Sequence, residues 1–220
     1  SSIYYSPVKS LSFEKINSKI IKKNTGLTND RIFSFSRIID YEKARVVEKD
    51  PKKRKLNNFL TLKNTPVLNK YNFSFYKNSL NLKFSNKIIF SSSINNTDQH
   101  YHLCNELIKL EPLIKEPIFL LVNKIHPFFD TTPTNTISVI NINSIKDLEK
   151  KLSIKIEHER FRGNIYIDGL RAWDEFNFIG KKLKINNICF KVQKSIPRCS
   201  ATNLKPNSES VTMNLPMNLK

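Results

Sequence analysis

Apolar and polar residues alternate in short runs over the first ninety positions, and this period of two is typical of β-strands. Gly26 and the pair Asn29-Asp30 separate the runs as predicted turns. Many short strands divided by turns favour a β-barrel or a β-sandwich. The alternation predicts strands at residues 3–8, 16–22, 31–38, 43–47, 72–76, 80–84 and 87–91.

From Thr97 onward, helical periodicity joins the strand patterns. Thr97 is predicted to cap a helix that ends at Pro112, and Ser144 to cap a shorter helix with one apolar face. Further strands are predicted at residues 118–123, 136–141, 164–168, 182–185 and 188–193. We therefore predict a mostly β protein with a few short helices, in which the character of the chain changes at Thr97.

The charge of the chain is strongly positive, with 37 Lys and Arg against 19 Asp and Glu and a net charge of +18. Only eight of the cations are arginine, and lysine is spread along the whole length beside many Asn and Ile. This distribution is typical of a general codon bias as much as of a built nucleic-acid patch. The densest basic run, residues 49–55, is predicted to be a solvated hairpin loop.

Several classes of site are excluded by the residues present. Four glycines cannot supply a dinucleotide fingerprint or a P-loop, and three scattered cysteines without Cys-x-x-Cys cannot hold an iron–sulfur cluster. His100 and His102 fall on different faces of the predicted helix, so we expect no joint metal site there. The sequence contains no 18-residue apolar run and no signal-peptide pattern, which favours a cytoplasmic protein without a membrane segment.

The three cysteines differ in setting. Cys104 lies in the apolar stripe of the first predicted helix and Cys189 inside a predicted strand, so packing explains both. Cys199 follows Pro197, which ends a strand, and Arg198, whose charge favours a thiolate. A thiolate in a loop can bind a soft metal or attack an electrophile, and the alternative is an ordinary exposed cysteine.

Four segments, taken in order, carry a resemblance to a known family. They read Ser-Pro-Val-Lys-Ser-Leu at 6–11, Gly-Leu-Thr-Asn-Asp-Arg at 26–31, Arg-Phe-Arg-Gly-Asn-Ile at 160–165 and Pro-Arg-Cys-Ser-Ala-Thr at 197–202. Together they resemble the MOSC family, related to the carboxy-terminal domain of molybdenum-cofactor sulfurase, and residues 162–180 are similar to its bacterial branch. Relatives include the mitochondrial amidoxime-reducing component and bacterial reductases that act on N-hydroxylated bases.

The resemblance implies a fold of two barrels. Residues 1–92 would form an amino-terminal β-barrel domain and residues 93–220 the MOSC β-barrel domain. The family continues beyond a leucine like Leu219 with closing strands, so we expect this chain to be incomplete at its carboxyl end. The sequence also departs from the family at Gly163, where proline is common, and after Thr202, where the usual Asp-Pro-x-Thr-Gly is replaced.

The resemblance also implies a cofactor site for molybdopterin with molybdenum. Cys199 would ligate the metal, with Asp130 near it. The remaining cofactor contacts would come from Lys9, Ser10, Arg31, Thr131, Thr132, Arg162, Asn164 and Arg198. Physically, arginines can fork onto phosphate or pterin oxygens and hydroxyls can bind polar edges. Taken singly, Arg162 is equally a surface residue, and Asp130 and Thr131 are equally turn residues.

Three functions remain open from the sequence. The leading hypothesis is a molybdenum-cofactor oxidoreductase that reduces N-hydroxylated or N-oxide-type small molecules, with electrons from a separate ferredoxin- or flavoprotein-type donor. The second is a carrier of the molybdenum cofactor or of persulfide sulfur, without turnover. The third is a basic RNA-binding barrel, which is disfavoured because no aromatic residues are interleaved with the basic segments. The family also has an association with pyridoxal phosphate binding.

Overall fold

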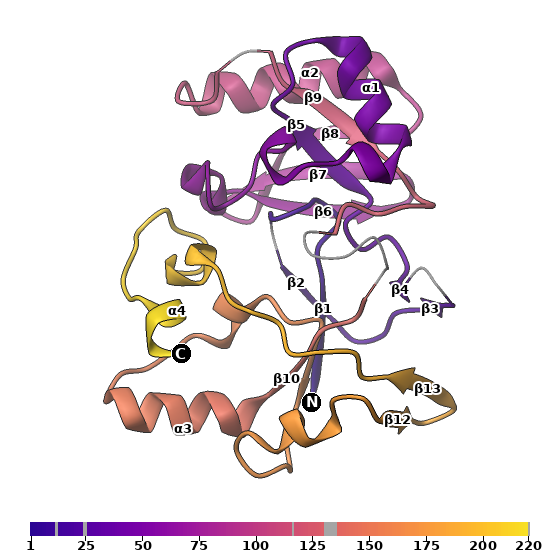
Figure 1. Cartoon of the computed structure of the whole chain (residues 1–220). Coiled ribbons are helices and arrows are strands. Elements are labelled where there is room, and N and C mark those ends of the chain that lie inside the picture. The colour runs from indigo at the N-terminus through magenta and orange to yellow at the C-terminus, as the bar shows by residue number, and fades with distance from the viewer. Residues whose placement is uncertain (12, 24–25, 116, 130–135, 220) are drawn as a thin grey trace.

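The computed structural model describes residues 1–11, 13–23, 26–115, 117–129 and 136–219. Figure 1 shows two regions, one above the other. The upper region consists of the described residues between 32 and 122, and the lower region consists of the first strands of the chain together with residues 136–219. The fold is mixed α/β with several small sheets.

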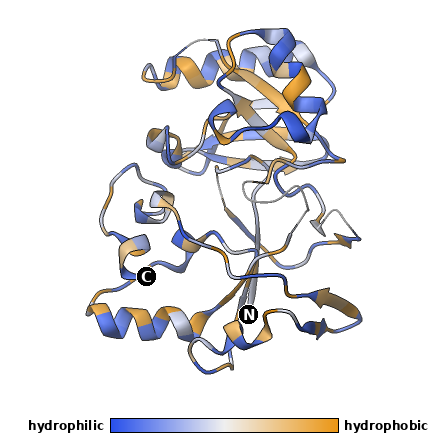
Figure 2. Ribbon diagram, in the orientation of Figure 1, coloured by the Kyte–Doolittle hydropathy of each residue, from blue (hydrophilic) through white to orange (hydrophobic). Residues whose placement is uncertain are grey.

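The upper region is built from two small sheets and two helices. Strand β5 (Phe33–Ser36) pairs antiparallel with β9 (Phe119–Val122), and β6 (Asn72–Tyr76), β7 (Ser79–Phe84) and β8 (Lys87–Ser93) form a meander. Helix α2 (Thr97–Leu110) packs against β8 and β9, while α1 (Tyr41–Lys49) packs against β9. In Figure 2 the apolar colour is concentrated on these strands.

The lower region contains a four-stranded sheet in the order β10-β11-β1-β2. Strands β10 (Val139–Asn141) and β11 (Ile165–Ile167) run parallel, joined by the amphipathic helix α3 (Ile142–Leu152). Strand β1 (Ser2–Tyr5) lies between β11 and β2 (Glu14–Ile16), antiparallel to both. The remaining elements are the hairpins β3 (Ile21–Lys22) with β4 (Gly26–Leu27) and β12 (Lys182–Ile185) with β13 (Ile188–Lys191), and the short helix α4 (Leu215–Asn218).

The predicted barrels are not found, because no sheet closes on itself among the described residues. Closure requires a continuous ladder of tilted strands, whereas three of the five sheets here have only two strands. The strand pairing also crosses the predicted boundary in both directions: β1 joins the sheet of β10 and β11, and β9 joins β5. The division at residue 92 stays a prediction.

The strand predicted at residues 43–47 is wrong, because this segment is part of α1. Asp40 caps the helix by accepting a hydrogen bond from the backbone N–H of Lys43 (3.0 Å), and the buried Ala44 and Val47 are three positions apart, which fits a helix. The basic run at 49–55 is likewise not a hairpin loop. It contains the end of α1 and a 3-10 helix, Pro51–Lys53, with Asp50 as its cap. Its lysines are exposed, as predicted.

The two predicted helices exist, but each is capped by a residue other than the predicted one. Asn96 rather than Thr97 caps α2, accepting from the Gln99 N–H (3.0 Å). Asn141 caps α3, and Ser144 lies on its buried face, where its hydroxyl donates to Glu175 (2.7 Å). Asparagine caps as well as serine or threonine does, and the asparagines lie one position before the predicted cap in α2 and three positions before it in α3. No helix in the described ranges is long and apolar enough to cross a bilayer.

Candidate cofactor site

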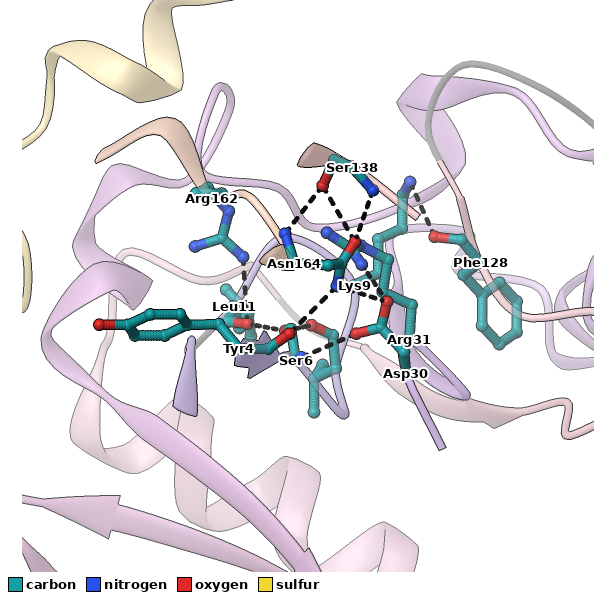
Figure 3. Close-up of polar contacts among 11 residues, drawn as sticks. Tyr4, Ser6, Lys9, Leu11, Asp30, Arg31, Phe128, Ser138, Arg162 and Asn164 are labelled. Carbon is teal, nitrogen blue, oxygen red and sulfur yellow. Dashed lines mark hydrogen bonds and ion pairs between the residues drawn. The ribbon is translucent and has the colours of Figure 1, made fainter. Parts of the chain in front are cut away.

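Asp30 lies at the junction of the two regions and is almost fully buried. Its carboxylate accepts hydrogen bonds from the backbone N–H of Ser6 (2.8 Å) and from the side-chain amide of Asn164 (3.2 Å), and it forms a close ion pair with Arg31 (Figure 3). A buried carboxylate is tolerated when its charge is paired and its oxygens are hydrogen-bonded. Asp30 therefore connects three segments that are far apart in the sequence.

Asn164, at the start of β11, is the second buried centre of this junction. Its amide oxygen accepts from the N–H (3.2 Å) and the hydroxyl (3.0 Å) of Ser138, and its amide nitrogen donates to the carbonyl of Tyr4 (3.2 Å) and to Asp30. All these partners belong to the protein, as Figure 3 shows. The side chain of Asn164 consequently holds the lower sheet against the Asp30 loop.

Two arginines that lie far apart in the sequence meet at one aromatic ring. The Arg162 guanidinium carbon lies 5.0 Å from the centroid of Phe13, and that of Arg31 lies 5.8 Å from the same centroid. Arg162 also donates to the carbonyl of Leu11 (3.3 Å). Both arginines have left-handed backbones, with φ of 51° and 55°, a conformation that non-glycine residues rarely adopt and that clusters at functional sites. Two cations at one ring form a positive centre suited to an anion.

Lys9 and Ser10 lie on the loop after β1. Lys9 is buried, with 2% of its surface exposed, and its ammonium donates to the carbonyl of Phe128 (3.4 Å) and lies 5.3 Å from the ring centroid of Phe59. Ser10 is half-buried with a left-handed backbone (φ 61°). A lysine is rarely buried without a reason, so Lys9 adds a further cation close to the junction of the two regions.

Cys199 is exposed and its thiol is free. It precedes a 3-10 helix, Ser200–Asn203, and its carbonyl accepts from the N–H (3.1 Å) and the hydroxyl (2.9 Å) of Thr202. The preceding Arg198 donates to the carbonyl of Phe161 (3.0 Å) and lies over the Phe161 ring (5.7 Å). Burial lowers the pKa of Arg198, and the neighbouring Tyr166 and Cys199 oppose that shift. Arg198 thus joins the cysteine segment to the residue before Arg162.

A small cavity of about 60 Å³ opens beside Arg160 and Arg162. Phe13, Glu159 and Arg162 line one part of it, and Ala201, two residues after Cys199, lines another. This volume accommodates a few water molecules or a small anion, whereas a drug-sized ligand fills several hundred Å³. Of the candidate site residues that the structure describes, only Arg162 lines this cavity. By chemical type, arginines and a buried lysine suit an anionic group and an exposed thiol suits a soft metal.

Gly163 stands where the family often has proline, and the structure gives a reason. A Cβ atom at this position would lie 2.4 Å from the Ile140 side chain, closer than such contacts occur. The Gly163 N–H also donates to the hydroxyl of Tyr166 (3.0 Å), a bond that proline cannot make. The glycine therefore lets the Arg162 turn pack against β10.

The predicted site residues fall into three groups. The first group lies at the junction of the two regions and contains Arg31, Arg162 and Asn164, with Lys9 and Ser10 on the adjoining loop. The second group is Arg198 and Cys199, which is connected to the first by the hydrogen bond from Arg198 to the carbonyl of Phe161. Asp130, Thr131 and Thr132 lie outside the described residues. Within the described ranges, no three His, Cys, Asp or Glu side chains are arranged to hold a metal ion.

The other two cysteines give one confirmed prediction and one correction. Cys104 is buried in α2 as predicted, and burial raises the pKa of its thiol to about 12. Cys189 is exposed, so the prediction that it packs inside a sheet is wrong. Its strand belongs to a two-stranded hairpin, and only one face of that hairpin is half-buried.

Sequence reasoning missed the residues that assemble the site. Asp30, Ser6, Ser138 and Phe13 hold the arginines and Asn164 in place. The one local signal was the Asp30-Arg31 pair in a predicted turn, where an acid beside a base suggests an ion pair. Ser138 and Phe13 carry no comparable signal, because their partners are distant in sequence.

Comparison with known proteins bears on the second half of the chain. Residues 126–218 match the family model of the MOSC domain, and the chain therefore carries a MOSC domain over this range. That family is associated with binding of the molybdenum cofactor, and its members are often reductases that depend on it. The matched range includes Arg162, Asn164, Arg198 and Cys199. No curated protein matches the chain.

Proposed function

We propose that this chain, with its MOSC domain, binds the molybdenum cofactor and reduces N-hydroxylated or N-oxide-type small molecules. The observation that carries the proposal is the convergence of Arg31 and Arg162 on Phe13 from segments 131 positions apart (162 − 31). Each of the two arginines has a left-handed backbone; Arg162 donates to the carbonyl of Leu11, and Arg31 pairs with its neighbour Asp30. This arrangement supports an anion site rather than two unrelated surface cations.

In this proposal the chain holds both ends of the cofactor, the anionic end and the metal end. Arg31 and Arg162 bind its anionic groups, with Lys9 and Ser10 on the adjoining loop, and Cys199 supplies the thiolate ligand. When bound, the cofactor supplies a metal that accepts and donates two electrons. We keep Asp130 beside the metal and Thr131 and Thr132 on the cofactor as predictions, together with a contact from Arg198.

The protein's own groups position these contacts. Asp30 fixes the guanidinium of Arg31, and Asn164 fixes Asp30. Arg198, the residue before Cys199, is held by the carbonyl of Phe161. The amide of Asn164 makes all its hydrogen bonds to protein groups. In this proposal Asn164 therefore does not touch the cofactor itself and instead holds Asp30, which positions Arg31.

The overall reaction balances with a separate electron donor. An N-hydroxylated amine, R–NH–OH, takes up two electrons and two protons to give R–NH₂ and water, and the N–O bond is broken. The electrons come from a ferredoxin- or flavoprotein-type carrier, since the sequence contains no motif for a flavin or an iron–sulfur cluster. The free state of all three cysteines suits the reducing cytoplasm.

The ligand assignment is tested by comparing two exposed cysteines. The protein is produced in a host that makes the cofactor, and molybdenum is measured by mass spectrometry together with the fluorescence of the oxidised pterin. We expect Cys199→Ser to lose more than about nine-tenths of the bound molybdenum, because a hydroxyl is a poor ligand for a soft metal. Cys189→Ser, the matched exposed control, should retain it.

Two outcomes contradict the proposal. If the wild-type protein carries neither molybdenum nor pterin, the chain does not bind the cofactor. If Cys199→Ser and Cys189→Ser retain equal amounts of metal, Cys199 is not the ligand. Circular dichroism of both variants shows that neither result comes from misfolding.

A second candidate function is a carrier that passes on the cofactor or persulfide sulfur without turnover. The exposure of Cys199 favours it, because a thiol at the surface is accessible to a partner protein. The two functions are separated by supplying a chemical reductant and an amidoxime or hydroxylamine to the cofactor-loaded protein. Formation of the reduced product supports the reductase. Transfer of cofactor to an apo-enzyme without any product supports the carrier.

A further inference from the structure

Two short helices at the candidate site lie against each other. The 3-10 helix η4 (His158–Phe161) comes directly before Arg162, and the 3-10 helix η6 (Ser200–Asn203) comes directly after Cys199. The two helices are in contact, and residues of both line the cavity beside Arg162. Their mutual position therefore sets how far the proposed metal ligand lies from an arginine that is proposed to bind the anionic end.

Arg160 is the residue of η4 that bonds to η6. Its side chain is only 1% exposed, and all three guanidinium nitrogens donate hydrogen bonds. Nε bonds to the carboxylate of Glu157 (2.6 Å), Nη1 to the carbonyl of Asn203 (3.0 Å) and Nη2 to the hydroxyl of Thr212 (2.7 Å). A planar guanidinium can hold three such directions at once, whereas a lysine ammonium is a single point.

A second arginine makes the reciprocal bond. Arg198, directly before Cys199, donates to the carbonyl of Phe161, the last residue of η4 (3.0 Å). Arg160, in η4, donates to the carbonyl of Asn203, the last residue of η6. Cys199 and η6 therefore lie between two arginine–carbonyl bonds that run in opposite directions between the same two segments. Two bonds constrain both the distance and the rotation of one segment against the other, which one bond cannot do.

Arg160 also fixes the chain that follows η6. The Asn203 carbonyl accepts a second hydrogen bond from the N–H of Thr212 (3.1 Å), and the Asn203 side-chain oxygen accepts one from the N–H of Leu215 (3.0 Å). Asn203 and Thr212 flank the loop 204–211, whose end residues pair with each other. Because Arg160 bonds to both flanking residues, its loss would release the loop together with the carboxyl end of η6.

A direct contact between Arg160 and an anion is the alternative, because Arg160 lines the same cavity as Arg162. The charge of Arg160 is, however, paired with Glu157, and this hydrogen bond lowers the pKa of the Glu157 carboxyl. All three guanidinium nitrogens already have protein acceptors. These contacts favour a link between protein segments over an anion contact.

We propose that Arg160 is a positioning residue that fixes the Cys199 segment against the Arg162 turn and so sets the span between the two ends of the cofactor site. The identity of the ligand rests on the proposed function, whereas the link between the two segments is a property of the chain alone. Segments that are already held in place lose less conformational freedom when a ligand binds, so the ligand binds more tightly.

The test uses substitutions that keep the positive charge. Arg160→Lys offers one nitrogen in place of three, and Thr212→Val removes a single acceptor and leaves Arg160 in place. Arg45→Lys is the matched control in the upper region. Arg45 also pairs with a glutamate three positions away (Glu48, 2.7 Å) and donates to a carbonyl distant in sequence (Leu120, 3.1 Å).

The first measurement needs no cofactor and follows hydrogen exchange by NMR in the full chain. The amides of Arg162 and Thr202, which close turns at η4 and η6, bond to backbone carbonyls at 3.0 Å and 3.1 Å. We expect both to exchange about tenfold faster in Arg160→Lys and about threefold faster in Thr212→Val, because lost hydrogen bonds ease local opening. Arg45→Lys should change them less than about twofold, since distant sites act independently.

The second measurement is the rate at which the cofactor-loaded protein loses molybdenum during dialysis. We expect about tenfold faster loss from Arg160→Lys, because groups that orient a metal ligand commonly change metal affinity by at least that factor. Arg45→Lys should stay within about twofold of the wild type. In a Cys199→Ser background, Arg160→Lys should accelerate the loss of pterin less than about twofold, because the thiolate that it positions is absent.

Three results overturn the proposal. Equal acceleration of molybdenum loss by Arg160→Lys and Arg45→Lys would indicate a general loss of stability. Multiplied effects of Arg160→Lys and Cys199→Ser would show that Arg160 binds the cofactor directly. Unchanged hydrogen exchange in both Arg160→Lys and Thr212→Val would show that the link does not order the two helices. A wild-type protein without molybdenum or pterin defeats the proposed function instead, and the exchange measurement then decides the link by itself.

Discussion

The upper and lower regions differ in how they bury their chain. Among the described residues, the larger apolar cluster joins twenty-one buried side chains, all but Val8, Leu11 and Leu204 from the upper region, while the cluster of the lower region joins eight. The larger core is formed by strands and helices that face each other. The smaller one lies mainly between α3 and the sheet of β1, β10 and β11, and much of the surrounding chain is irregular.

The two regions contribute differently to the candidate site: the upper region mainly supports it, and the lower region supplies most of its reactive side chains. The upper region contributes fixed points to the junction, such as the strand that follows Arg31, whereas the lower region contributes Arg162, Arg198 and Cys199 from turns and loops. Functional side chains are commonly carried by loops on a rigid scaffold. The contrast predicts that substitutions in the upper core act on stability and that those in the lower region act on the site.

The largest effect is expected from cavities in the two cores. Leu82→Ala, in the upper core, should lower the free energy of unfolding by about 3–5 kcal/mol, since a cavity in a densely packed core cannot collapse. Leu148→Ala, in the lower core, should cost about 2–3 kcal/mol because fewer neighbours surround it. Urea unfolding measures both. Equal losses would show that the two cores are packed alike.

A smaller effect is expected at the junction. Asp30→Asn removes the charge that pairs with Arg31 and places an amide donor against that of Asn164, which should cost about 1–3 kcal/mol. Hydrogen exchange should then increase in β1 and β11 before it does in β6, β7 and β8. The control Asp40→Asn, at the cap of α1, should cost about 0.5 kcal/mol or less because asparagine also caps helices. Equal costs would contradict a special role for Asp30.

The smallest effect is the response of the upper region to acid. His100 is buried in α2 and its ring nitrogen Nε2 bonds with the Ser93 carbonyl (3.0 Å); burial lowers the pKa of this histidine. As the pH falls below 6.5, the unfolded chain takes up a proton that the folded chain does not, so stability decreases, by at most about 1.4 kcal/mol per pH unit. His100→Gln should flatten this dependence of urea midpoints on pH. A slope in His100→Gln identical to that of the wild type would refute the assignment.

Local sequence patterns predicted the elements that local forces determine. The strands β6, β7 and β8 and the buried face of α2 agree with their apolar spacing. The strand prediction for residues 43–47 is wrong because a short β-branched run has no clear period. The N-cap at Asp40 stabilises a helix over this segment instead. The barrel prediction failed because closure depends on how separate sheets pair, which no single segment encodes.

The candidate site follows the same division. A cysteine after a proline and an arginine is a local signal, and Cys199 was identified from it. The contact between Asp30 and Asn164 joins residues 134 positions apart, so it depends on the finished fold. Resemblance to a family named Arg31 and Arg162, but their shared position at Phe13 could be seen only in three dimensions.

The pairing of the first strand has a consequence for synthesis. Ser2 and Ile3 of β1 pair with Tyr166 and Ile165 of β11. At about 5–20 residues per second, the ribosome needs roughly ten to thirty seconds to complete the chain between these partners. The strands of the upper region find their partners between residues 33 and 122 and can pair earlier. Strand β1 can pair with β2 early, but its place beside β11, and with it the junction that gathers the arginines, forms only after residue 166 has left the ribosome.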